Sequence, residues 1–313
     1  MTHFGGGAVR RRRGMVLALS AAVVAAALPT AAAGAADAPP SAVSAAPLPG
    51  IGAKGAYLLD GGANRPLWAK AAHTRRQMAS TTKAMTAVVV LDMHGAELHR
   101  RVTVKKSYRD YVYRNGASSA DLRPGDQLTV RQLLYALMLP SGCDAAYALA
   151  DTFGGGRTEG RRVRSFIEQM NARAKALGLR HTKYDSFDGI SAHGRNYTTP
   201  RDLVQLARHA LENRTFAAVV KSARTRQRAA NVHRTYTWYN TNKLLGSYQG
   251  ALGIKTGTGT RAGACLVFAA ERGGRTVVGA LLDDNSGRYR DAVRMLDYAF
   301  RTAGTEWARR GDA

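Results

Sequence analysis

The positions of the extended segments restrict the fold more than any other feature of this sequence. Short apolar runs typical of strands lie near the start, at 56–59 and 66–69, and again near the end, at 252–256, 264–270 and 276–282. Helical patterns fill most of the sequence between them. The economical solution is one antiparallel sheet assembled from both ends of the chain, with flanking helices and an inserted all-helical domain. The sequence therefore predicts an α+β fold.

The N-terminal segment has the features of an export signal. Four arginines at 10–13 precede an uncharged apolar run from Met15 to Leu28 and a stretch of small residues that ends at Ala36. The apolar run is shorter than the roughly 20 residues that a membrane span needs. We expect cleavage near residue 36 and a secreted or extracytoplasmic protein, at the cell wall or the outer face of the membrane. An uncleaved anchor helix is the alternative, and Sec and twin-arginine export both stay open.

The rest of the chain divides by composition and pattern. A segment rich in proline, alanine and serine follows the signal and reads as a linker. One folded domain comes next and ends before a short polar tail. The expected divisions are a signal peptide at 1–36, a linker at 37–50, a domain at 51–303 with a sheet subdomain (about 51–93 and 245–303) and a helical subdomain (about 94–244), and a tail at 304–313.

The first candidate motif is Ser80-Thr81-Thr82-Lys83, at the start of a long apolar helix. Residues three apart share a helix face, so Ser80 and Lys83 can point into one cleft. A serine hydroxyl is a poor nucleophile without a base. An amine accepts a proton only in its neutral form, which burial or a second cation favours. The alternative is a helix-capping serine beside a solvated lysine.

Two further motifs follow in the sequence. Ser141-Gly142-Cys143 lies in a loop between two apolar helices, where the serine could relay a proton or simply cap a helix. Lys255-Thr256-Gly257-Thr258 ends a strand. Gly257 there would let a substrate backbone approach closely, and the threonine hydroxyls could bind a carboxylate. Each motif alone is weak, but the three in this order are the set found in penicillin-binding proteins and class A β-lactamases.

With these motifs the chain resembles the low-molecular-mass penicillin-binding proteins, which are serine DD-carboxypeptidases and DD-transpeptidases. The resemblance covers most of residues 51–301, and the pattern is similar to that of secreted actinobacterial DD-transpeptidases, which also carry a cysteine in the second motif. Other segments that carry the resemblance are Thr74-Arg75-Arg76, Phe187-Asp188-Gly189-Ile190, Thr199-Pro200-Arg201-Asp202-Leu203 and Asn240-Thr241-Asn242-Lys243-Leu244-Leu245. The resemblance implies a serine β-lactamase/DD-peptidase-like fold.

The resemblance also implies a reaction and residue roles. Ser80 would attack the carbonyl of the penultimate D-Ala in a peptidoglycan stem peptide, Lys83 would accept its proton, and β-lactams would acylate the same serine. No metal or cofactor is implied. The remaining expected roles are proton delivery to the departing D-Ala (Ser141, Lys255), an oxyanion hole (backbone N–H groups of Ser80 and Thr258) and substrate binding (Cys143, Thr256, Gly257, Thr258).

Cys143 departs from the family pattern, which usually has asparagine at this position. Cysteine is a weak hydrogen-bond donor and acceptor, so the grip on substrate and the fate of the acyl-enzyme are both affected. We expect transfer to an amine to be favoured over hydrolysis. Cys143 as the nucleophile is an alternative, although no histidine lies near it in sequence. Whether Cys143 pairs with Cys265 stays open.

Two other functions compete with this interpretation. A class A β-lactamase needs a glutamate to activate water. The nearest match is Glu168-Gln169-Met170-Asn171, whose asparagine comes one residue early, so we interpret Glu168 as a solvated helix residue. A non-catalytic wall-binding protein is the second alternative.

The net charge of +24 comes mostly from scattered arginines, and loss of the four in the signal would leave +20. The absence of a basic run interleaved with aromatics argues against nucleic acid as a partner. Anionic cell-envelope polymers are a candidate partner, and a solvated basic surface is the alternative.

Overall fold

The computed structural model describes residues 50–285 and 287–310, with the backbone alone at 96 and at 302–310. The predicted signal peptide and nearly all of the predicted linker lie outside these residues. Their cleavage and localisation therefore stay predictions.

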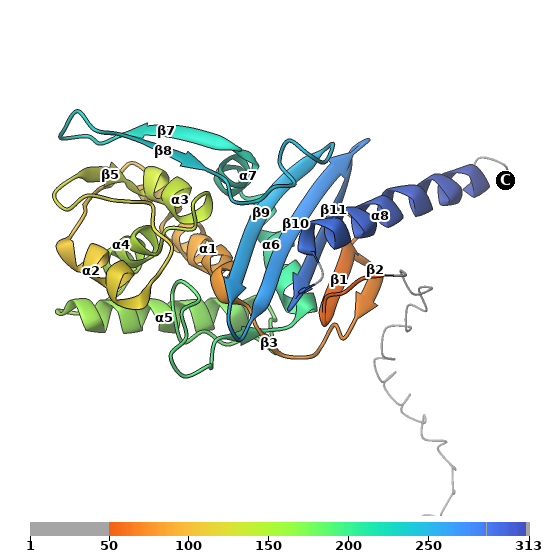
Figure 1. The fold of residues 1–313 in the computed structure, drawn as a ribbon, viewed down its shortest axis with the longest axis horizontal. Coiled ribbons are helices and arrows are strands. Elements are labelled where there is room, and N and C mark those ends of the chain that lie inside the picture. The colour runs from red at the N-terminus through yellow and green to blue at the C-terminus, as the bar shows by residue number, and fades with distance from the viewer. Residues whose placement is uncertain (1–49, 286, 311–313) are drawn as a thin grey trace, which may run out of the picture. The chain divides into compact units, whose positions relative to one another are not determined.

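A five-stranded antiparallel sheet forms the centre of the molecule, in the order β2-β1-β11-β10-β9 (Figure 1). Its first two strands come from the start of the domain and its last three from the end, which confirms the prediction of one sheet built from both ends. Gly273 and Gly274 connect β10 to β11 in the predicted hairpin. The strands are β1 (Gly55–Asp60), β2 (Arg65–Lys70), β9 (Ala251–Gly259), β10 (Gly263–Arg272) and β11 (Arg275–Leu282).

Both faces of the sheet are buried, and alternate residues of each strand enter two different cores. Leu58 and Phe268 pack with α8 (Arg288–Arg310), whereas Leu59 and Val267 belong to the larger core that the other helices cover. On that larger-core face, α6 (Pro200–Glu212) contacts β1 and β11. This two-sided burial explains why the central strands read as nearly continuous apolar runs.

The helix α1 (Lys83–His94) is buried along most of its length and joins the two parts of the molecule. It contacts α3, α4 and α5 on one side and α6 and α7 on the other, which accounts for its apolar residues on every face. The helices that remain are α2 (Lys106–Asn115), α3 (Val130–Met138), α4 (Cys143–Phe153), α5 (Glu159–Ala176) and α7 (Arg214–Lys221).

The inserted part is not all-helical, in contrast to the prediction. It also contains a short β4–β5 pair (Arg101–Thr103 and Gln127–Thr129) and a longer β7–β8 hairpin (Arg224–Arg228 and Thr235–Tyr239). The first pair is too short to give a pattern. The second was missed because the β7 sequence, Arg-Thr-Arg-Gln-Arg, has no apolar residue.

Two element boundaries also differ from the prediction. The helix α8 runs to Arg310, so most of the expected polar tail is helical. The helix α6 packs on the sheet, although its residues lie in the range expected for the helical subdomain. A last two-stranded pair, β3 (Arg76–Gln77) with β6 (Tyr197–Thr198), lies near the start of α1.

Candidate active site

Ser80 lies in a single 3₁₀ turn, Ala79–Thr82, that leads directly into α1. Ala79 has a left-handed backbone (φ 45°), a conformation that costs a residue with a Cβ about 1–2 kcal/mol. Side chains hold the turn in place, because the Thr81 hydroxyl donates to Met78 O (2.7 Å) and the Thr82 hydroxyl to Ala79 O (2.8 Å). The surrounding hydrogen bonds therefore fix the orientation of Ser80.

Two glycines from different segments of the chain lie against this turn. Gly189 has a φ of 101°, and a Cβ there would collide with Ala79 O and the Ser80 amide. A Cβ at Gly257 on β9 would lie 2.8 Å from Met78 O and 3.1 Å from Ser80 N. Only glycine allows both backbones to approach the serine this closely.

Lys83 is fully buried, and its side-chain nitrogen has three polar neighbours. Its Nζ lies 3.1 Å from Ser80 Oγ, 3.3 Å from Cys143 Sγ and 2.8 Å from Asp188 O. These three contacts fix the direction of the side-chain nitrogen, toward Ser80 on one hand and toward Cys143 and Asp188 on the other. The structure thus brings the first motif and the cysteine of the second into direct contact.

The second motif lies beside the start of α4, and Ser118 holds it in place. Ser118 Oγ donates to Ser141 O (2.6 Å), and Cys143 N donates to Ser118 O (2.9 Å). Ser141 has a left-handed backbone (φ 65°) and is buried. Among the described residues its Oγ has no hydrogen-bond partner. Burial raises the pKa of the Cys143 thiol, although the charge of Lys83 opposes the shift. The thiol is therefore a poor candidate for the nucleophile.

Lys255, on β9, is as buried as Lys83 but has poorer partners. Its Nζ donates only to the neighbouring Thr256 O (3.1 Å) among the described residues. Burial, and next the charge of Lys83, hold the pKa of Lys255 well below its usual value. The structure thus places the two amines close enough to interact electrostatically.

The threonines of the third motif differ in their surroundings. Thr256 is buried, and its Oγ1 lies 2.7 Å from Thr241 Oγ1. Thr258 is exposed, and its Oγ1 accepts a hydrogen bond from Arg288 (3.0 Å). The same guanidinium also donates to Gly257 O (2.6 Å). Sequence reasoning missed Arg288, which follows the motif by about 30 residues and belongs to no local pattern.

A second missed feature is the carboxylate of Asp188, whose main-chain oxygen binds Lys83. Its Oδ2 accepts from the Tyr111 hydroxyl (2.9 Å) and its Oδ1 from Ile190 N (2.9 Å). Tyr111 packs against Tyr147 and Phe187 in an aromatic cluster. The Phe187-Asp188 sequence pointed to the family, but nothing in it pointed to a tyrosine 77 residues earlier.

An open cleft of about 480 Å³ lies between the sheet and the helical part. Arg261 is the one charged side chain among the described residues that line it, and no carboxylate does. Glu168 is exposed on α5 and does not line this cleft. Both thiols are buried and unpaired. No group of three or more potential metal ligands occurs among the described residues. The lining of the cleft includes Ser80, Ser118, Cys143, Gly189, Thr258 and Arg261.

A cleft serine in contact with a buried lysine, at the junction of an antiparallel sheet and a helical insertion, is typical of the class of serine acyl-transfer enzymes that includes the penicillin-binding proteins. The family model for D-alanyl-D-alanine carboxypeptidases matches residues 41–286. The chain belongs to this family.

Known relatives agree with this assignment. The chain is 51% identical over 258 residues to a D-alanyl-D-alanine carboxypeptidase of Streptomyces sp. (strain K15), covering 80% of this chain and 88% of that protein. The crystal structure of the DD-transpeptidase from that Streptomyces matches with a TM-score of 0.79 at 52% identity, over 81% of this chain and 98% of that one. A penicillin-binding protein homologue from Mycobacterium tuberculosis matches with a TM-score of 0.72 at 28% identity, over 83% and 95%.

Proposed function

We propose that this D-alanyl-D-alanine carboxypeptidase/transpeptidase uses Ser80 as its nucleophile and Lys83 as the base that activates it. The observation that carries the proposal is the 3.1 Å contact between Lys83 Nζ and Ser80 Oγ. This distance lies within the hydrogen-bond reach that general-base catalysis requires. The side chain of Lys83 is also fully buried, so the base is shielded from bulk water.

The proposed reaction begins when Ser80 Oγ attacks the carbonyl carbon of the penultimate D-Ala and its proton passes to neutral Lys83 Nζ. The amides of Ser80 and Thr258 stabilise the oxyanion, because donors aimed at developing charge lower the barrier. The C–N bond then breaks, and the departing D-Ala amine takes up the proton that Lys83 accepted, relayed through Ser141 and Lys255, so that Lys83 is neutral again. The product is an ester between Ser80 and the peptide.

Recognition of the substrate's terminal carboxylate falls to the third motif. We propose that Thr258 and Arg288 bind it directly, because Arg288 lies 3.0 Å from the exposed Thr258 hydroxyl. Thr256 is buried and already contacts Thr241, so it contributes by fixing the end of β9. Gly257 keeps β9 close to Ser80, as the lack of room for a Cβ supports.

We propose that the acyl-enzyme transfers its peptide to an amine faster than to water. No carboxylate lines the described part of the cleft, and the Asp188 carboxylate is engaged by Tyr111 and Ile190 N. Water therefore lacks a dedicated base, whereas a bound amine gains from proximity. A relative carries the name DD-transpeptidase, which agrees with this balance.

The expected location is outside the cytoplasm, after cleavage of the predicted signal peptide. The described helices include none that is long and apolar enough to span a membrane. The partners that we propose are peptidoglycan stem peptides, β-lactams as covalent inhibitors, and an anionic polymer of the cell envelope.

The decisive experiment is covalent labelling with a fluorescent penicillin, followed by peptide mapping. The label should be on Ser80 and should be lost in Ser80→Ala. Label at Cys143, or label that persists in the variant, would overturn the assignment. The ratio of transfer to an amine over hydrolysis is measured with a D-Ala-D-Ala peptide as substrate, with and without glycine as the acceptor. A product mixture that stays mostly free acid at millimolar glycine would show an ordinary carboxypeptidase.

A further inference from the structure

An unusual distribution of charge distinguishes one region of the chain. Residues 213–270 contain no aspartate or glutamate but nine lysines and arginines. Three of these arginines lie on β7, at every second position: Arg224, Arg226 and Arg228. Alternate residues of a strand point to the same face, so these three side chains share one face of the β7–β8 hairpin. All three are exposed.

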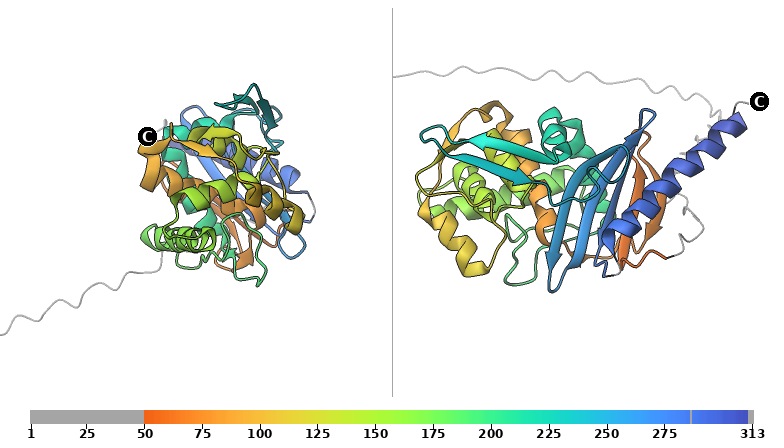
Figure 2. Two further views of the ribbon diagram at one scale, coloured as in Figure 1. Left: turned by 90° about the vertical axis from the view of Figure 1, so that its left-hand side faces the viewer. Right: turned by 45° about the horizontal axis from the view of Figure 1, so that its top comes forward.

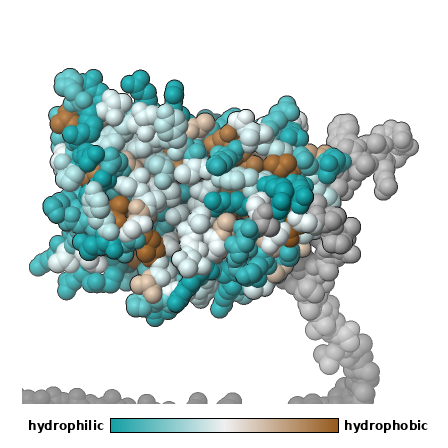
Figure 3. Space-filling view, in the orientation of Figure 1, coloured by the Kyte–Doolittle hydropathy of each residue, from teal (hydrophilic) through white to brown (hydrophobic). Residues whose placement is uncertain are grey.

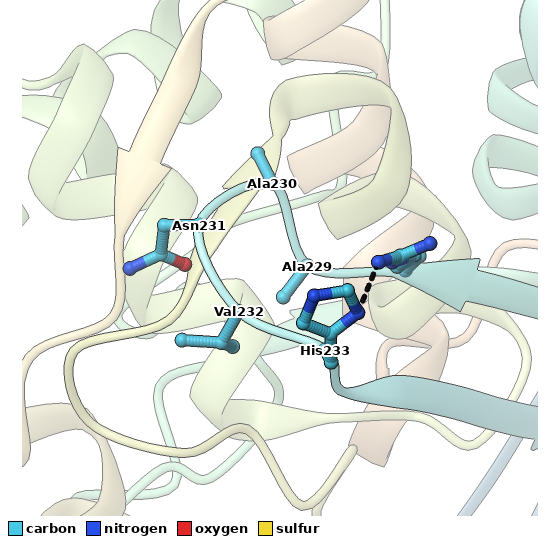
Figure 4. A pocket seen from close by; sticks show the side chains of 6 residues that line it. Ala229, Ala230, Asn231, Val232 and His233 are labelled. Carbon is cyan, nitrogen blue, oxygen red and sulfur yellow. Dashed lines mark hydrogen bonds between the residues drawn. The ribbon is translucent and has the colours of Figure 1, made fainter.

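The register of the hairpin adds hydroxyl groups to the same face. Arg224 pairs with Tyr239, Arg226 with Thr237 and Arg228 with Thr235, and directly paired residues of antiparallel strands lie on one side. All three residues of β8 are exposed as well. Within the described residues, no carboxylate forms an ion pair with any of the three arginines, and Arg228 contacts His233 (Figure 4). Cations and neutral donors therefore alternate across the outer face of the hairpin.

Side chains on the opposite face and in the connecting loop attach the hairpin to the rest of the protein. Trp238 is buried, and its indole N–H donates to Ala120 O (2.8 Å). Tyr236 is also buried and donates to Asp126 (2.6 Å), which binds Arg234 as well. In the loop that joins the strands, Asn231 bonds to Gly125 O and Gln127 N (2.9 Å each). The basic face is thus preorganised, which reduces the entropy lost on binding.

We propose that the outer face of the β7–β8 hairpin binds a linear phosphodiester polymer of the cell wall. Arginine guanidinium groups match phosphate geometry through paired hydrogen bonds. Successive arginines on the strand are about 6.6–6.8 Å apart, since a strand rises 3.3–3.4 Å per residue. Such a row suits an extended chain with regularly spaced anions better than one compact anion. The net charge, +24 for the whole sequence and +20 after the expected loss of the signal, supplies long-range attraction to the same partner.

The composition of the face argues for a polymer without bases or lipid tails. A membrane-binding surface needs apolar side chains that insert, and single-stranded nucleic acid needs exposed aromatics for stacking. Here Tyr236 and Trp238 point inward, and Tyr239 is the exposed aromatic of the two strands. The edge of the molecule where the hairpin lies in Figure 1 is mostly hydrophilic (Figure 3). A hollow of about 380 Å³ at the tip of the hairpin is lined by Arg228–His233 (Figure 4).

The test compares two triple variants that change the net charge equally. The first removes the row: Arg224→Gln, Arg226→Gln and Arg228→Gln. The control removes three exposed arginines on and after α5, which lies on the opposite side from the hairpin in Figure 1 and in the left view of Figure 2: Arg161→Gln, Arg164→Gln and Arg180→Gln. The ligand is a fluorescent synthetic poly(glycerol phosphate), and binding is followed by anisotropy as salt rises.

We expect the hairpin variant to bind at least tenfold more weakly at about 0.1 M salt, where the Debye length is about 10 Å. The slope of log affinity against log salt should become shallower by about 2, since each lost phosphate contact removes about 0.7 for a single-stranded polyanion. The control variant should lose far less affinity. Penicillin acylation of Ser80 should be unchanged in both variants, which shows that they fold and separates this test from that of the proposed function.

Three results would overturn the proposal. Equal losses in the two triple variants would mean that only net charge matters. Binding to anionic phospholipid vesicles that depends on the hairpin, with no dependence for the polymer, would identify a membrane surface instead. Tighter binding of oligo-dT than of poly(glycerol phosphate) at equal charge would identify nucleic acid.

Discussion

Two fully buried lysines, Lys83 on the helical side and Lys255 on the sheet, belong to the motifs around Ser80, and their surroundings differ. The Nζ of Lys83, on α1, lies 2.8–3.3 Å from three polar atoms, which are contributed by the 3₁₀ turn before α1, by α4 and by the loop before β6. Lys255, on β9, donates to the carbonyl of its own neighbour, and its pKa is strongly depressed by burial and by Lys83. One amine is held by several elements of the fold, whereas the other is held by its strand alone.

This difference separates two tasks that the reaction requires. A base that removes the serine proton has to be oriented toward Oγ, and multiple fixed partners supply that orientation. A group that assists the leaving amine has to exchange protons readily, and a depressed pKa brings a lysine closer to neutral pH. We therefore assign orientation to the helical side of the cleft and proton exchange to the sheet side.

The largest expected effect comes from removing the oriented base. Lys83→Ala should lower the rate of acylation by penicillin by about 10²–10⁴-fold, the usual contribution of general-base catalysis. The measurement is stopped-flow or gel-based labelling at fixed penicillin concentration. The exposed Lys221→Ala on α7 serves as the matched control and should acylate normally. Normal acylation without Lys83 would leave Lys255 as the base and break the comparison.

The second prediction concerns how Lys83 is held. Tyr111→Phe removes the hydroxyl that donates to Asp188, whose carbonyl binds Lys83, and should slow acylation about tenfold, since misplacement by about 1 Å can cost 10²-fold. Tyr108→Phe is the control, because Tyr108 donates to a different buried carboxylate, Asp151 (2.7 Å). Each change leaves a carboxylate short of one donor and should destabilise folding by about 1–3 kcal/mol.

Stability and acylation together distinguish positioning from a structural role. Urea midpoints should fall in both tyrosine variants, whereas acylation should slow only in Tyr111→Phe. Equal slowing of acylation in the two variants would mean that the slowing follows from the lower stability and not from the lost hydrogen bond between Tyr111 and Asp188. Unchanged acylation in both would mean that the Asp188 loop does not orient Lys83.

The sequence predicts those features of the helical and sheet sides of the cleft that depend on short, local residue patterns. The sheet built from both ends, and the three motifs on a helix start, a loop and a strand, followed from patterns within about ten residues. The partners of the motifs did not. Arg288 reaches Thr258 across 30 residues, and Tyr111 reaches Asp188 across 77. Such contacts depend on tertiary packing, because tyrosine and arginine on a helix surface have no distinctive pattern of their own.

The sequence does not predict the β7–β8 hairpin, for a different reason. Strands are recognised by apolar residues at every second position, and the inward, half-buried face of β7 carries Thr225 and Gln227 instead. Only Tyr236 and Trp238 on β8 give the alternation, over too few residues to outweigh the arginines. The arginines that prevent recognition of β7 as a strand are the same residues to which we assign the binding role.

The third prediction tests the sheet side through the pH dependence of stability. The folded pKa of Lys255 lies well below its usual value, so between the folded and unfolded pKa values the unfolded chain binds the extra proton. Stability therefore rises with pH in this range, by at most about 1.4 kcal/mol per pH unit for one proton, and the benefit is lost as pH falls toward the folded pKa. Lys255→Met should remove this rise.

Urea midpoints between neutral pH and about pH 10, near the unfolded lysine value, measure the difference. The variant's stability relative to wild type should be highest at neutral pH and should decline as pH increases. The exposed Lys221→Met should run parallel to wild type. If the Lys255→Met curve also ran parallel to wild type, burial would not lower the pKa of Lys255. The two lysines would then differ in their hydrogen-bond partners but not in their electrostatics.

The smallest expected effect concerns the third partner of Lys83, the Cys143 thiol. Asparagine offers a stronger donor and acceptor to the substrate peptide, so Cys143→Asn should acylate about two- to tenfold faster, the worth of one net hydrogen bond of 0.5–1.5 kcal/mol. The buried Cys265→Ala, whose thiol instead contacts Ala262 O, is the control for loss of a buried thiol and should leave the rate unchanged. Slower acylation by Cys143→Asn would mean that the thiol mainly positions Lys83, whose Nζ lies 3.3 Å from Sγ. An unchanged rate would mean that this side chain does not contact the substrate. The ratio of aminolysis to hydrolysis, measured with added glycine, decides whether Cys143 also sets the fate of the acyl-enzyme, because a gain in acylation with no change in that ratio would confine its role to substrate binding.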